Sequence, residues 1–307
     1  MCRHLAYLGP PVSLASLVLE PEHSLYQQSW APSDMRGGGS VNADGFGIGW
    51  YVDEVEAAGN PDAPTDDRRP VRYRRSVPIW ADESLPGLAR VVQSGAVLAA
   101  VRNGTVGSPL NESAVAPFVR DQWLFSHNGL ISGWPGSVSK LAETLPVSEL
   151  LTLDAPMDSA LLWALIQDRL YSGSSADAGS SASASASASV SAAEAVAAVV
   201  REVAAAAPES RLNVLLTDGE QIVATTWTHS LWVRRTAESV AVSSEPWTAD
   251  GWEEVPDRSL VLATKNALAI SPLTPTSPAT PGTAPIPGTP LASRSEELPM
   301  EGRQCHL

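Results

Sequence analysis

The second residue of the chain is a cysteine, and Cys2 offers more chemistry than any other position. Removal of Met1 would make Cys2 the N-terminal residue, with a thiol and a free α-amine on one carbon skeleton. A thiolate is a strong nucleophile, and an α-amine with an ordinary pKa of about 7.7–8.0 is partly neutral near pH 7 and can serve as a base. Cys2 could therefore supply a nucleophile and its base. The alternative is an incidental cysteine at a frayed chain end.

A candidate oxyanion hole lies at Asn128 and Gly129, where a predicted strand ends. The asparagine amide and the backbone N–H of the glycine can point two hydrogen-bond donors at one position. Acyl transfer needs such donors for the negative charge that develops on the carbonyl oxygen, and loss of one donor typically costs about 10²–10³ in rate. The alternative is a hairpin turn, because Asn-Gly is a common pair in two-residue turns.

Arg102 and Asp158 could hold the two charged groups of an α-amino acid. Arg102 stands where an apolar strand stops, and its planar guanidinium suits a carboxylate, with the hydroxyl of Thr105 as a second donor. Asp158 opens a predicted helix and could accept hydrogen bonds from an ammonium group. The alternatives are a solvated arginine on a surface loop and a simple helix cap.

Composition disfavours several classes of function. The 307 residues carry a formal net charge of −14, so we expect no nucleic-acid partner. The two cysteines, Cys2 and Cys305, and five histidines without an HExxH pattern predict no zinc motif and no disulfide framework. No apolar run approaches the ~20 residues of a membrane span, and no signal-peptide core precedes Cys2. We therefore expect a cytoplasmic protein without a membrane partner.

Two low-complexity segments divide the chain. Residues 172–193 are rich in Ser and Ala, and residues 271–307 are rich in Pro and Thr. Neither has the apolar content to offset the entropy of ordering. We expect a flexible insertion and a disordered tail, respectively, with one domain over residues 2–270. A Pro/Asp-rich stretch at Gly59–Arg69 is expected to connect two strands.

Apolar runs and helical spacing predict the elements of this domain. The expected strands are Phe46–Val52, Val71–Arg75, Ala96–Arg102, Gln122–Ser126, Leu212–Thr217, Gln221–Thr228, Leu231–Arg234, Val240–Ser243 and Ser259–Ala263. The expected helices are Val12–Leu19, Leu85–Ser94, Asp158–Tyr171 and Glu194–Ala206. Hairpin strands, two of them joined by Asp218-Gly219, with helices gathered between them indicate an α+β layered fold. The sequence contains no nucleotide-binding glycine motif after a strand.

The chemically interesting segments, in their order along the chain, resemble those of the class II glutamine amidotransferases, which are N-terminal-nucleophile hydrolases. The similar segments are MCR at the start, NADGFGIGW from Asn42, RNGT from Arg102, HNG from His127 and MDS from Met157. The resemblance covers roughly residues 2–265. It implies a four-layer αββα sandwich, in which two antiparallel sheets lie between helical layers.

The same resemblance implies a role for each candidate residue. It assigns catalysis to Cys2, Asn128 and Gly129, and substrate binding to Arg102, Thr105, His127 and Asp158. Cys2 would be the nucleophile, while Arg102 and Asp158 would hold the α-carboxylate and the α-amine of a glutamyl group. The implied reaction is hydrolysis of a γ-glutamyl amide through a glutamyl thioester, which requires no metal or organic cofactor.

Within the family, the opening MCRHLAYLG, the WAP tripeptide at Trp30 and the SEPW segment at Ser244 resemble the stand-alone branch of ergothioneine biosynthesis. This likeness implies a small-molecule substrate, γ-glutamyl-hercynylcysteine sulfoxide. Two alternatives stay open: a glutaminase subunit that supplies ammonia to a separate synthase, and a silent module that only binds a glutamyl group. Intact Cys2, Asn128 and Gly129 argue against the silent module, because a sensor has no need of the nucleophile.

Overall fold

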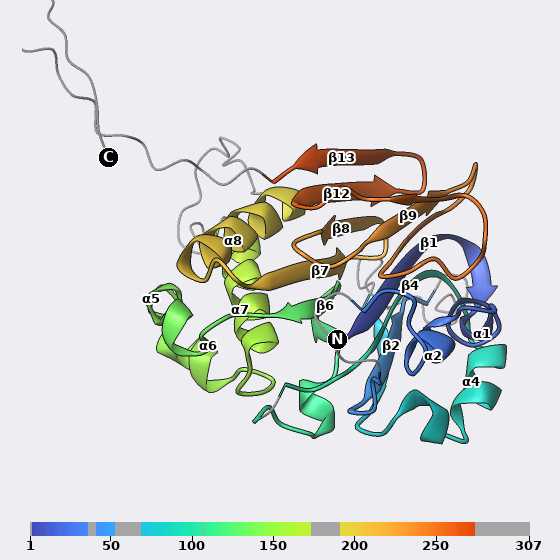
Figure 1. Cartoon of the computed structure of the whole chain (residues 1–307), viewed down its shortest axis with the longest axis horizontal. Helices are drawn as coiled ribbons and strands as arrows, with labels where there is room; N and C mark the ends of the chain where they lie inside the picture. Colours follow the sequence, from blue (N-terminus) through green and yellow to red (C-terminus); the bar gives the residue numbers. More distant parts are fainter. Residues whose placement is uncertain (1, 36–40, 53–68, 106, 173–190, 274–307) are drawn as a thin grey trace, which may run out of the picture. The chain divides into compact units, whose positions relative to one another are not determined.

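Two antiparallel sheets face each other in the computed structural model, which describes residues 2–35, 41–52, 69–105, 107–172 and 191–273 (Figure 1). The first sheet has the strand order β11-β9-β10-β1-β4-β2-β3. Its strands are β1 (Arg3–Ser13), β2 (Phe46–Trp50), β3 (Val71–Arg75), β4 (Gln93–Val101), β9 (Trp232–Arg235), β10 (Val240–Ser243) and β11 (Trp252–Glu254). The second sheet has the order β13-β12-β8-β7-β6-β5. Its strands are β5 (Phe118–Arg120), β6 (Trp123–Leu130), β7 (Arg211–Thr217), β8 (Gln221–Thr225), β12 (Ser259–Thr264) and β13 (Leu268–Pro272).

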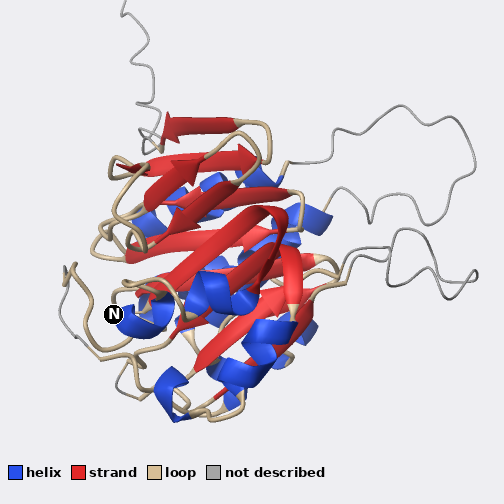
Figure 2. Ribbon diagram, turned by 90° about the vertical axis from the view of Figure 1, so that its right-hand side faces the viewer, coloured by secondary structure: helices blue, strands red, loops and turns tan. Residues whose placement is uncertain are grey.

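Helices cover the outer face of each sheet (Figure 2). The first sheet carries α1 (Leu14–Val18), α2 (Leu25–Gln28) and α4 (Leu85–Val91). The second carries α5 (Ser139–Ala142), α6 (Val147–Leu151), α7 (Asp158–Tyr171) and α8 (Ala192–Ala206). Short 3₁₀ turns occur at Ile79–Ala81, Glu112–Ala114 and Gly136–Val138. Within the described ranges, no helix is long and apolar enough to cross a bilayer.

Three apolar clusters hold the four layers together. One lies between the first sheet and its helices, one between the two sheets, and one between the second sheet and its helices. Burial of apolar area in these three interfaces is the main driving force for a layered fold. The αββα sandwich predicted from the sequence is therefore confirmed.

The two long helices form where the sequence predicts them, for local reasons. Helix α7 occupies the predicted range Asp158–Tyr171, and its apolar positions face the second sheet. Helix α8 begins after Ser191, whose side chain accepts a hydrogen bond from the backbone N–H of Glu194 while the Glu194 side chain bonds back. This reciprocal capping satisfies two N–H groups that the first turn leaves unpaired.

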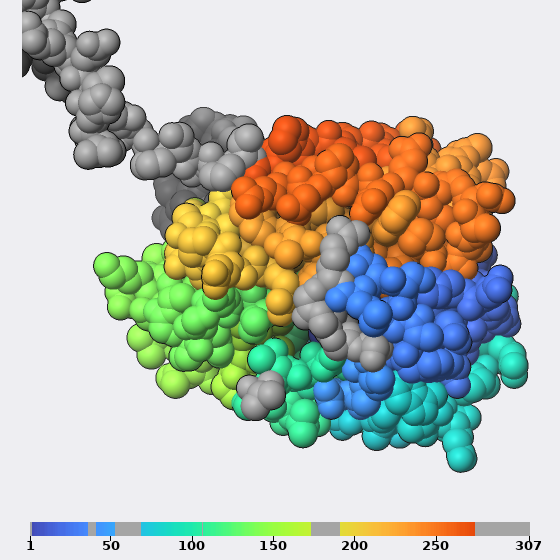
Figure 3. Space-filling model, in the orientation of Figure 1, coloured from blue at the N-terminus to red at the C-terminus, as the bar shows by residue number. Residues whose placement is uncertain are grey.

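Strand β1 lies in the middle of the first sheet, paired antiparallel with β4 and β10. Pairing with β10 brings the N-terminal segment beside the C-terminal part of the domain. Both parts are visible on the same face of the molecule in Figure 3. Successive side chains of a strand point to opposite faces. Leu5 and Tyr7 pack under the helices, whereas Ala6 and Leu8 pack between the sheets.

Four strands, β1, β5, β11 and β13, lie outside the predicted set. Strands β5 and β11 have three residues each, too short for an alternation pattern to be recognised. Strand β1 begins with the polar residues Arg3 and His4, which are nevertheless almost completely buried. Their burial depends on partners far away in the sequence, so no local pattern indicates it.

The structure corrects the predicted limits of both low-complexity segments. Ser271 and Pro272 belong to β13, and Leu273 is 1 % exposed, so the ordered domain continues past the predicted end at residue 270. The described residues belong to one compact unit, Met1–Pro275. The predicted insertion at 172–193 ends too late, because α8 begins at Ala192. The rest of that insertion, most of Gly59–Arg69 and the tail from residue 274 lie outside the described residues.

The predicted hairpin at Asp218-Gly219 is confirmed, since these two residues join β7 to β8. Gly219 has a φ of 89°, a conformation that side chains rarely allow. The carboxylate of Asp218 accepts hydrogen bonds from the backbone N–H groups of Glu220 at 3.0 Å and Gln221 at 2.9 Å. The φ of Gly219 and the acceptor side chain of Asp218 therefore both suit the turn.

The corrected domain boundary can be tested with Leu273→Ala. Its side chain packs in the core beneath the second sheet, so we expect a loss of about 2–5 kcal/mol in the free energy of unfolding. The control is Ile270→Ala in β13, three residues earlier and 40 % exposed, which should cost less than about 1 kcal/mol. Urea denaturation of both variants measures the difference. Two equally small effects would support the boundary at residue 270.

Candidate active site

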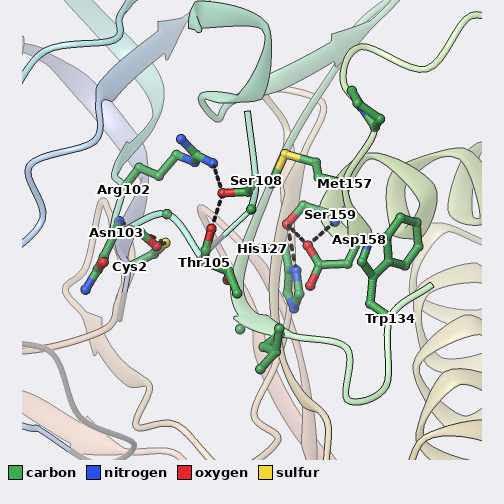
Figure 4. Close-up of a pocket in the computed structure, with 15 residues that line it drawn as sticks. Cys2, Arg102, Asn103, Thr105, Ser108, His127, Trp134, Met157, Asp158 and Ser159 are labelled. Carbon is green, nitrogen blue, oxygen red and sulfur yellow. Dashed lines mark hydrogen bonds between the residues drawn. The ribbon is translucent and has the colours of Figure 1, made fainter. Parts of the chain in front are cut away.

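A pocket with a volume of about 140 Å³ gathers all but one of the predicted site residues (Figure 4). These residues are Cys2, Arg102, Thr105, His127, Gly129 and Asp158. The start of β1, the loop after β4, the end of β6 and the first turn of α7 form its walls. The remaining lining residues are Asn103, Gly104, Gly107, Ser108, Leu130, Trp134, Pro156, Met157 and Ser159.

Cys2 lies directly before β1, and backbone atoms of Asn103 hold its thiol. The backbone N–H of Asn103 donates to Sγ at 3.4 Å, and Sγ lies 3.6 Å from the carbonyl oxygen of the same residue. The backbone of one residue thus offers the sulfur both a donor and an acceptor. The cysteine is partly exposed to the pocket. Its sulfur is thus both accessible and provided with a donor.

Arg102 is buried, and its guanidinium contacts only neutral oxygens in the described part of the chain. Only 6 % of the residue is exposed. Nη2 donates to Ser108 Oγ at 2.8 Å, and Nη1 donates to the backbone oxygen of Asp44 at 3.4 Å. A buried cation without a carboxylate partner is costly unless a ligand supplies the counter-charge. The alternative of a solvated surface arginine is therefore wrong.

The loop that carries Arg102 is anchored to the segment that precedes β2. The backbone N–H of Gly104 donates to the carboxylate of Asp44 at 2.7 Å, and the backbone N–H of Arg102 donates to the carbonyl of Gly45 at 2.8 Å. The glycines of β2 allow this strand to pack closely, since a Cβ on Gly47 would lie 2.2 Å from the carbonyl oxygen of Ala116. The NADGFGIGW segment therefore supports the pocket without lining it.

Asp158 is the first residue of α7, and its N-cap is Met157. One carboxylate oxygen accepts from the backbone N–H of Ile131 at 2.9 Å, and the other accepts from the backbone N–H of Ser159 at 2.7 Å. A negative charge at this end of a helix is also stabilised by the helix dipole. Asp158 thus stabilises the start of α7 and still lines the pocket, where lone pairs remain for an ammonium group.

His127 lines the pocket, but both of its ring nitrogens have protein partners. Nδ1 lies 2.9 Å from Ser159 Oγ, and Nε2 lies 2.9 Å from the carbonyl oxygen of Arg211. Burial lowers the pKa of His127, so the ring is neutral. A neutral ring that donates from Nε2 accepts from the serine at Nδ1. A substrate could therefore contact the ring edge of His127 but would find no unoccupied ring nitrogen.

Asn128 and Gly129 lie within β6, paired with β7, so the hairpin-turn alternative is wrong. Asn128 lies four residues after Leu124 in β6, so both side chains face the space between the sheets. Asn128 is 1 % exposed. Its amide donates to Ser244 Oγ at 3.4 Å, and it does not line the pocket. Cys2 has the same parity in its chain segment as Ala6, so the thiol and the amide project from facing sheets.

Some pocket residues have no role predicted from the sequence, and they differ in whether a sequence motif pointed to their location. Asn103 and Ser159 belong to the RNGT and MDS segments, so their motifs indicated the location but not the contact. Ser108 lies beyond its motif, and only its hydrogen bond to Arg102 identifies it. Trp134 comes from the loop after β6 and forms an apolar wall. Within the described ranges, no group of His, Cys, Asp or Glu side chains could hold a metal ion.

Behind the pocket, two buried histidines stay neutral. Nδ1 of His4 lies 3.1 Å from Ser126 Oγ across the space between the sheets. Burial, with nearby positive groups, lowers the pKa of His4 to about 3, and the same two causes lower the pKa of His229 to about 3. Among the described residues, Nε2 of His4 and Nδ1 of His229 are buried without a hydrogen-bond partner. Burial therefore disfavours the protonated form of both rings.

Comparison with known proteins identifies the family of this chain. Residues 23–245 match the family model described as glutamine amidotransferases class-II. The gamma-glutamyl-hercynylcysteine sulfoxide hydrolase of Mycolicibacterium smegmatis is 36 % identical over 274 residues, which cover 89 % of this chain and 100 % of the relative. The hydrolase of the same name from Mycobacterium tuberculosis is 34 % identical, with coverage of 89 % and 97 %.

Solved structures agree on the fold. A glutamine aminotransferase class-II domain protein from Silicibacter pomeroyi superposes with a TM-score of 0.55 at 22 % identity, over 89 % of this chain and 100 % of that one. Glutamine phosphoribosylpyrophosphate amidotransferase from B. subtilis superposes with a TM-score of 0.56 at 12 % identity, over 89 % of this chain and 49 % of that one. The fold is thus that of the N-terminal-nucleophile amidotransferases. The chain belongs to the class II glutamine amidotransferase family.

The close contact at Gly129 predicts a strong effect of Gly129→Ala. A Cβ there would lie 1.8 Å from the carbonyl oxygen of Arg211 and 2.4 Å from Nε2 of His127, so β6 would have to move away from β7. We expect the rate of amide hydrolysis to fall at least about 10²-fold. The control is Gly87→Ala in α4, where a Cβ meets nothing within 4 Å and the rate should not change. A Gly129→Ala enzyme with normal rate and melting temperature would contradict this geometry.

The buried neutral histidines predict a pH dependence of stability. His4 and His229 have a pKa of about 3 in the folded protein, whereas an ordinary histidine has a pKa of about 6.5. Between these two pH values the unfolded chain therefore binds more protons than the folded chain. The free energy of unfolding should therefore fall as pH drops below about 6.5, by up to about 1.4 kcal/mol per pH unit for each histidine. His4→Asn should reduce this slope in urea denaturation between about pH 7.5 and 5. An unchanged slope would exclude His4 as the cause.

Proposed function

We propose that the protein hydrolyses the γ-glutamyl amide of γ-glutamyl-hercynylcysteine sulfoxide and releases glutamate and hercynylcysteine sulfoxide. The observation that carries the proposal is one pocket that combines the thiol of Cys2 with the guanidinium of Arg102 and the carboxylate of Asp158. The substrate class follows from the relatives at 34–36 % identity, which are named as hydrolases of this sulfoxide. The reaction takes place in the cytoplasm, where a thiol stays reduced.

The glutamyl half of the substrate binds through its two charged groups. The α-carboxylate pairs with Arg102, which has no carboxylate partner in the described chain, and the hydroxyl of Thr105 is a second donor. The α-ammonium group donates to Asp158. Figure 4 supports this orientation, because Cys2 and Arg102 lie on one side of the pocket and Asp158 on the other. A pocket of about 140 Å³ suits a single glutamyl group.

Cys2 then attacks the γ-carbonyl carbon. Once Met1 is removed, the neutral α-amine of Cys2 takes the proton of the thiol, and the backbone N–H of Asn103 stabilises the sulfur. The carbon–sulfur bond forms, and the electron pair of the carbonyl moves onto oxygen. The backbone N–H of Gly129 and the amide of Asn128 stabilise this oxyanion.

Collapse of this intermediate breaks the carbon–nitrogen bond. The leaving amine takes a proton from the ammonium group of Cys2 and departs as hercynylcysteine sulfoxide, while the glutamyl thioester remains on the enzyme. Water, activated by the regenerated amine, attacks the thioester, and glutamate leaves with the thiol restored. All steps use groups of the chain and water, with no metal or organic cofactor.

The test measures glutamate release from γ-glutamyl-hercynylcysteine sulfoxide and from glutamine by protein whose Met1 is absent. We expect the sulfoxide to be the better substrate by kcat/KM. Cys2→Ala should lower kcat at least about 10⁴-fold, since the nucleophile is lost, while the substrate still binds in calorimetry. Thr248→Ala, outside the pocket, is a control that should keep the normal rate.

Two outcomes would decide against the proposal. A Cys2→Ala enzyme with normal turnover would remove the nucleophile and with it the thioester. The protein could instead prefer glutamine to the sulfoxide and hydrolyse glutamine only slowly when it is alone. That result would favour the alternative of a glutaminase subunit that works with a separate synthase. The related probable glutamine amidotransferase of Saccharomyces cerevisiae, 26 % identical over 89 % of this chain, makes that comparison necessary.

A further inference from the structure

The dipeptide Ser244-Glu245 follows β10 and contacts the segments that carry both Cys2 and Asn128. Ser244 continues the pairing of β10 with β1, since its backbone N–H donates to the carbonyl of His4 at 2.9 Å. Its Oγ accepts from the backbone N–H of His4 at 3.0 Å and from the amide of Asn128 at 3.4 Å. One hydroxyl therefore connects β1 of the first sheet to β6 of the second.

Glu245 is one of the most extensively bonded carboxylates of the domain, although its side chain is only 2 % exposed. Oε1 accepts from Arg3 Nε at 2.7 Å and from the backbone N–H of Asp34 at 3.2 Å. Oε2 accepts from Ser33 N–H at 2.8 Å and lies 2.6 Å from His23 Nε2. Burial alone would raise the pKa of Glu245, but these donors and the charge of Arg3 lower it. The carboxylate is therefore ionised when the site is assembled.

Arg3 connects the carboxylate of Glu245 to the backbone of Cys2. Its side chain is 1 % exposed and paired with Glu245. Nη1 donates to the carbonyl oxygen of Cys2 at 3.0 Å, and Nη2 donates to the carbonyl oxygen of Asp34. The planar guanidinium makes these bonds in a rigid geometry that a lysine cannot reproduce. A displaced guanidinium would therefore displace the carbonyl of Cys2.

We propose that Ser244 and Glu245 are positioning residues that set the distance between the thiol of Cys2 and the amide of Asn128. Glu245 acts on Cys2 through Arg3, and Ser244 acts on Asn128 directly and on β1 through His4. The inference rests on the proposed function, in which Cys2 is the nucleophile and Asn128 stabilises the oxyanion. Neither Ser244 nor Glu245 lines the pocket, and the hydrogen bonds of both side chains go to protein groups.

Such positioning contacts matter because the rate of attack by the Cys2 thiolate depends strongly on its distance from the Asn128 amide. The two groups come from different sheets, and a misplacement of about 1 Å can cost roughly 100-fold in rate. Substrate binding does not share this sensitivity, because Arg102 and Asp158 belong to other segments. Loss of the positioning contacts should therefore lower kcat and leave KM nearly unchanged.

Glu245→Gln tests the first contact with little change in shape. The amide keeps one acceptor oxygen and loses the charge, so Arg3 is no longer held as an ion pair. We expect kcat for the sulfoxide substrate to fall about 100-fold with KM within about threefold of normal. Alkylation of Cys2 by iodoacetamide should stay within about twofold of the normal rate at each pH, because a small reagent needs the thiol but not the oxyanion hole.

Two further variants separate positioning from stability. Ser244→Ala removes only the hydroxyl and should also lower kcat without raising KM; it decides the question if Glu245→Gln does not fold. The matched control is Asp82→Asn, a carboxylate 4 % exposed that bonds Tyr73 and two backbone N–H groups away from the pocket. It should lower the melting temperature and leave kcat unchanged.

The inference fails if folded Ser244→Ala and Glu245→Gln turn over at the normal kcat, or if their defect appears in KM alone. It also fails if Asp82→Asn lowers kcat as much as they do, since general loss of stability would then explain the effect. These results are distinguishable from failure of the proposed function. If Cys2→Ala is inactive while both positioning variants are normal, the nucleophile stands and only the positioning role is lost.

Discussion

The position of Cys2 depends on the pairing of β1, because the residue lies directly before that strand. Strand β1 is hydrogen-bonded on both sides, to β4 and to β10. Pairing with β4 brings Cys2 beside the loop of Arg102 and Asn103, and pairing with β10 brings it beside Ser244. A strand held on one edge only would leave its first residue free to fray. The central place of β1 therefore makes the thiol a defined part of the site.

The period of two along a strand then decides which groups can meet. In β1 and β6, alternate residues face the helices and the space between the sheets. Cys2 and Asn128 both have the inward parity, whereas His127 faces α7 and bonds Ser159. A shift of either strand by one residue would turn one group away from the other. Of the HNG segment, His127 thus faces the helical layer, and Asn128 faces the space between the sheets.

Much of this arrangement could be predicted from the sequence, where the signal is local. Helix α7 has its predicted limits because its apolar spacing and its start are contained in its own residues. The burial of Arg102 could not be predicted, since it results from packing against the segment around Asp44 and Ser108. The pair of Arg3 with Glu245 spans 242 positions, a distance over which composition and periodicity carry no information.

Two buried arginines near Cys2 differ in the charge of their partners, and this difference assigns their roles. Arg3 is paired with an ionised carboxylate, so its charge is balanced within the protein. Arg102 bonds only neutral oxygens of Ser108 and Asp44 in the described chain, so its charge is unbalanced where the pocket opens. Burial of an unpaired cation opposes folding unless a ligand repays it. Arg3 is therefore suited to hold backbone in place, and Arg102 is suited to receive the carboxylate of a substrate.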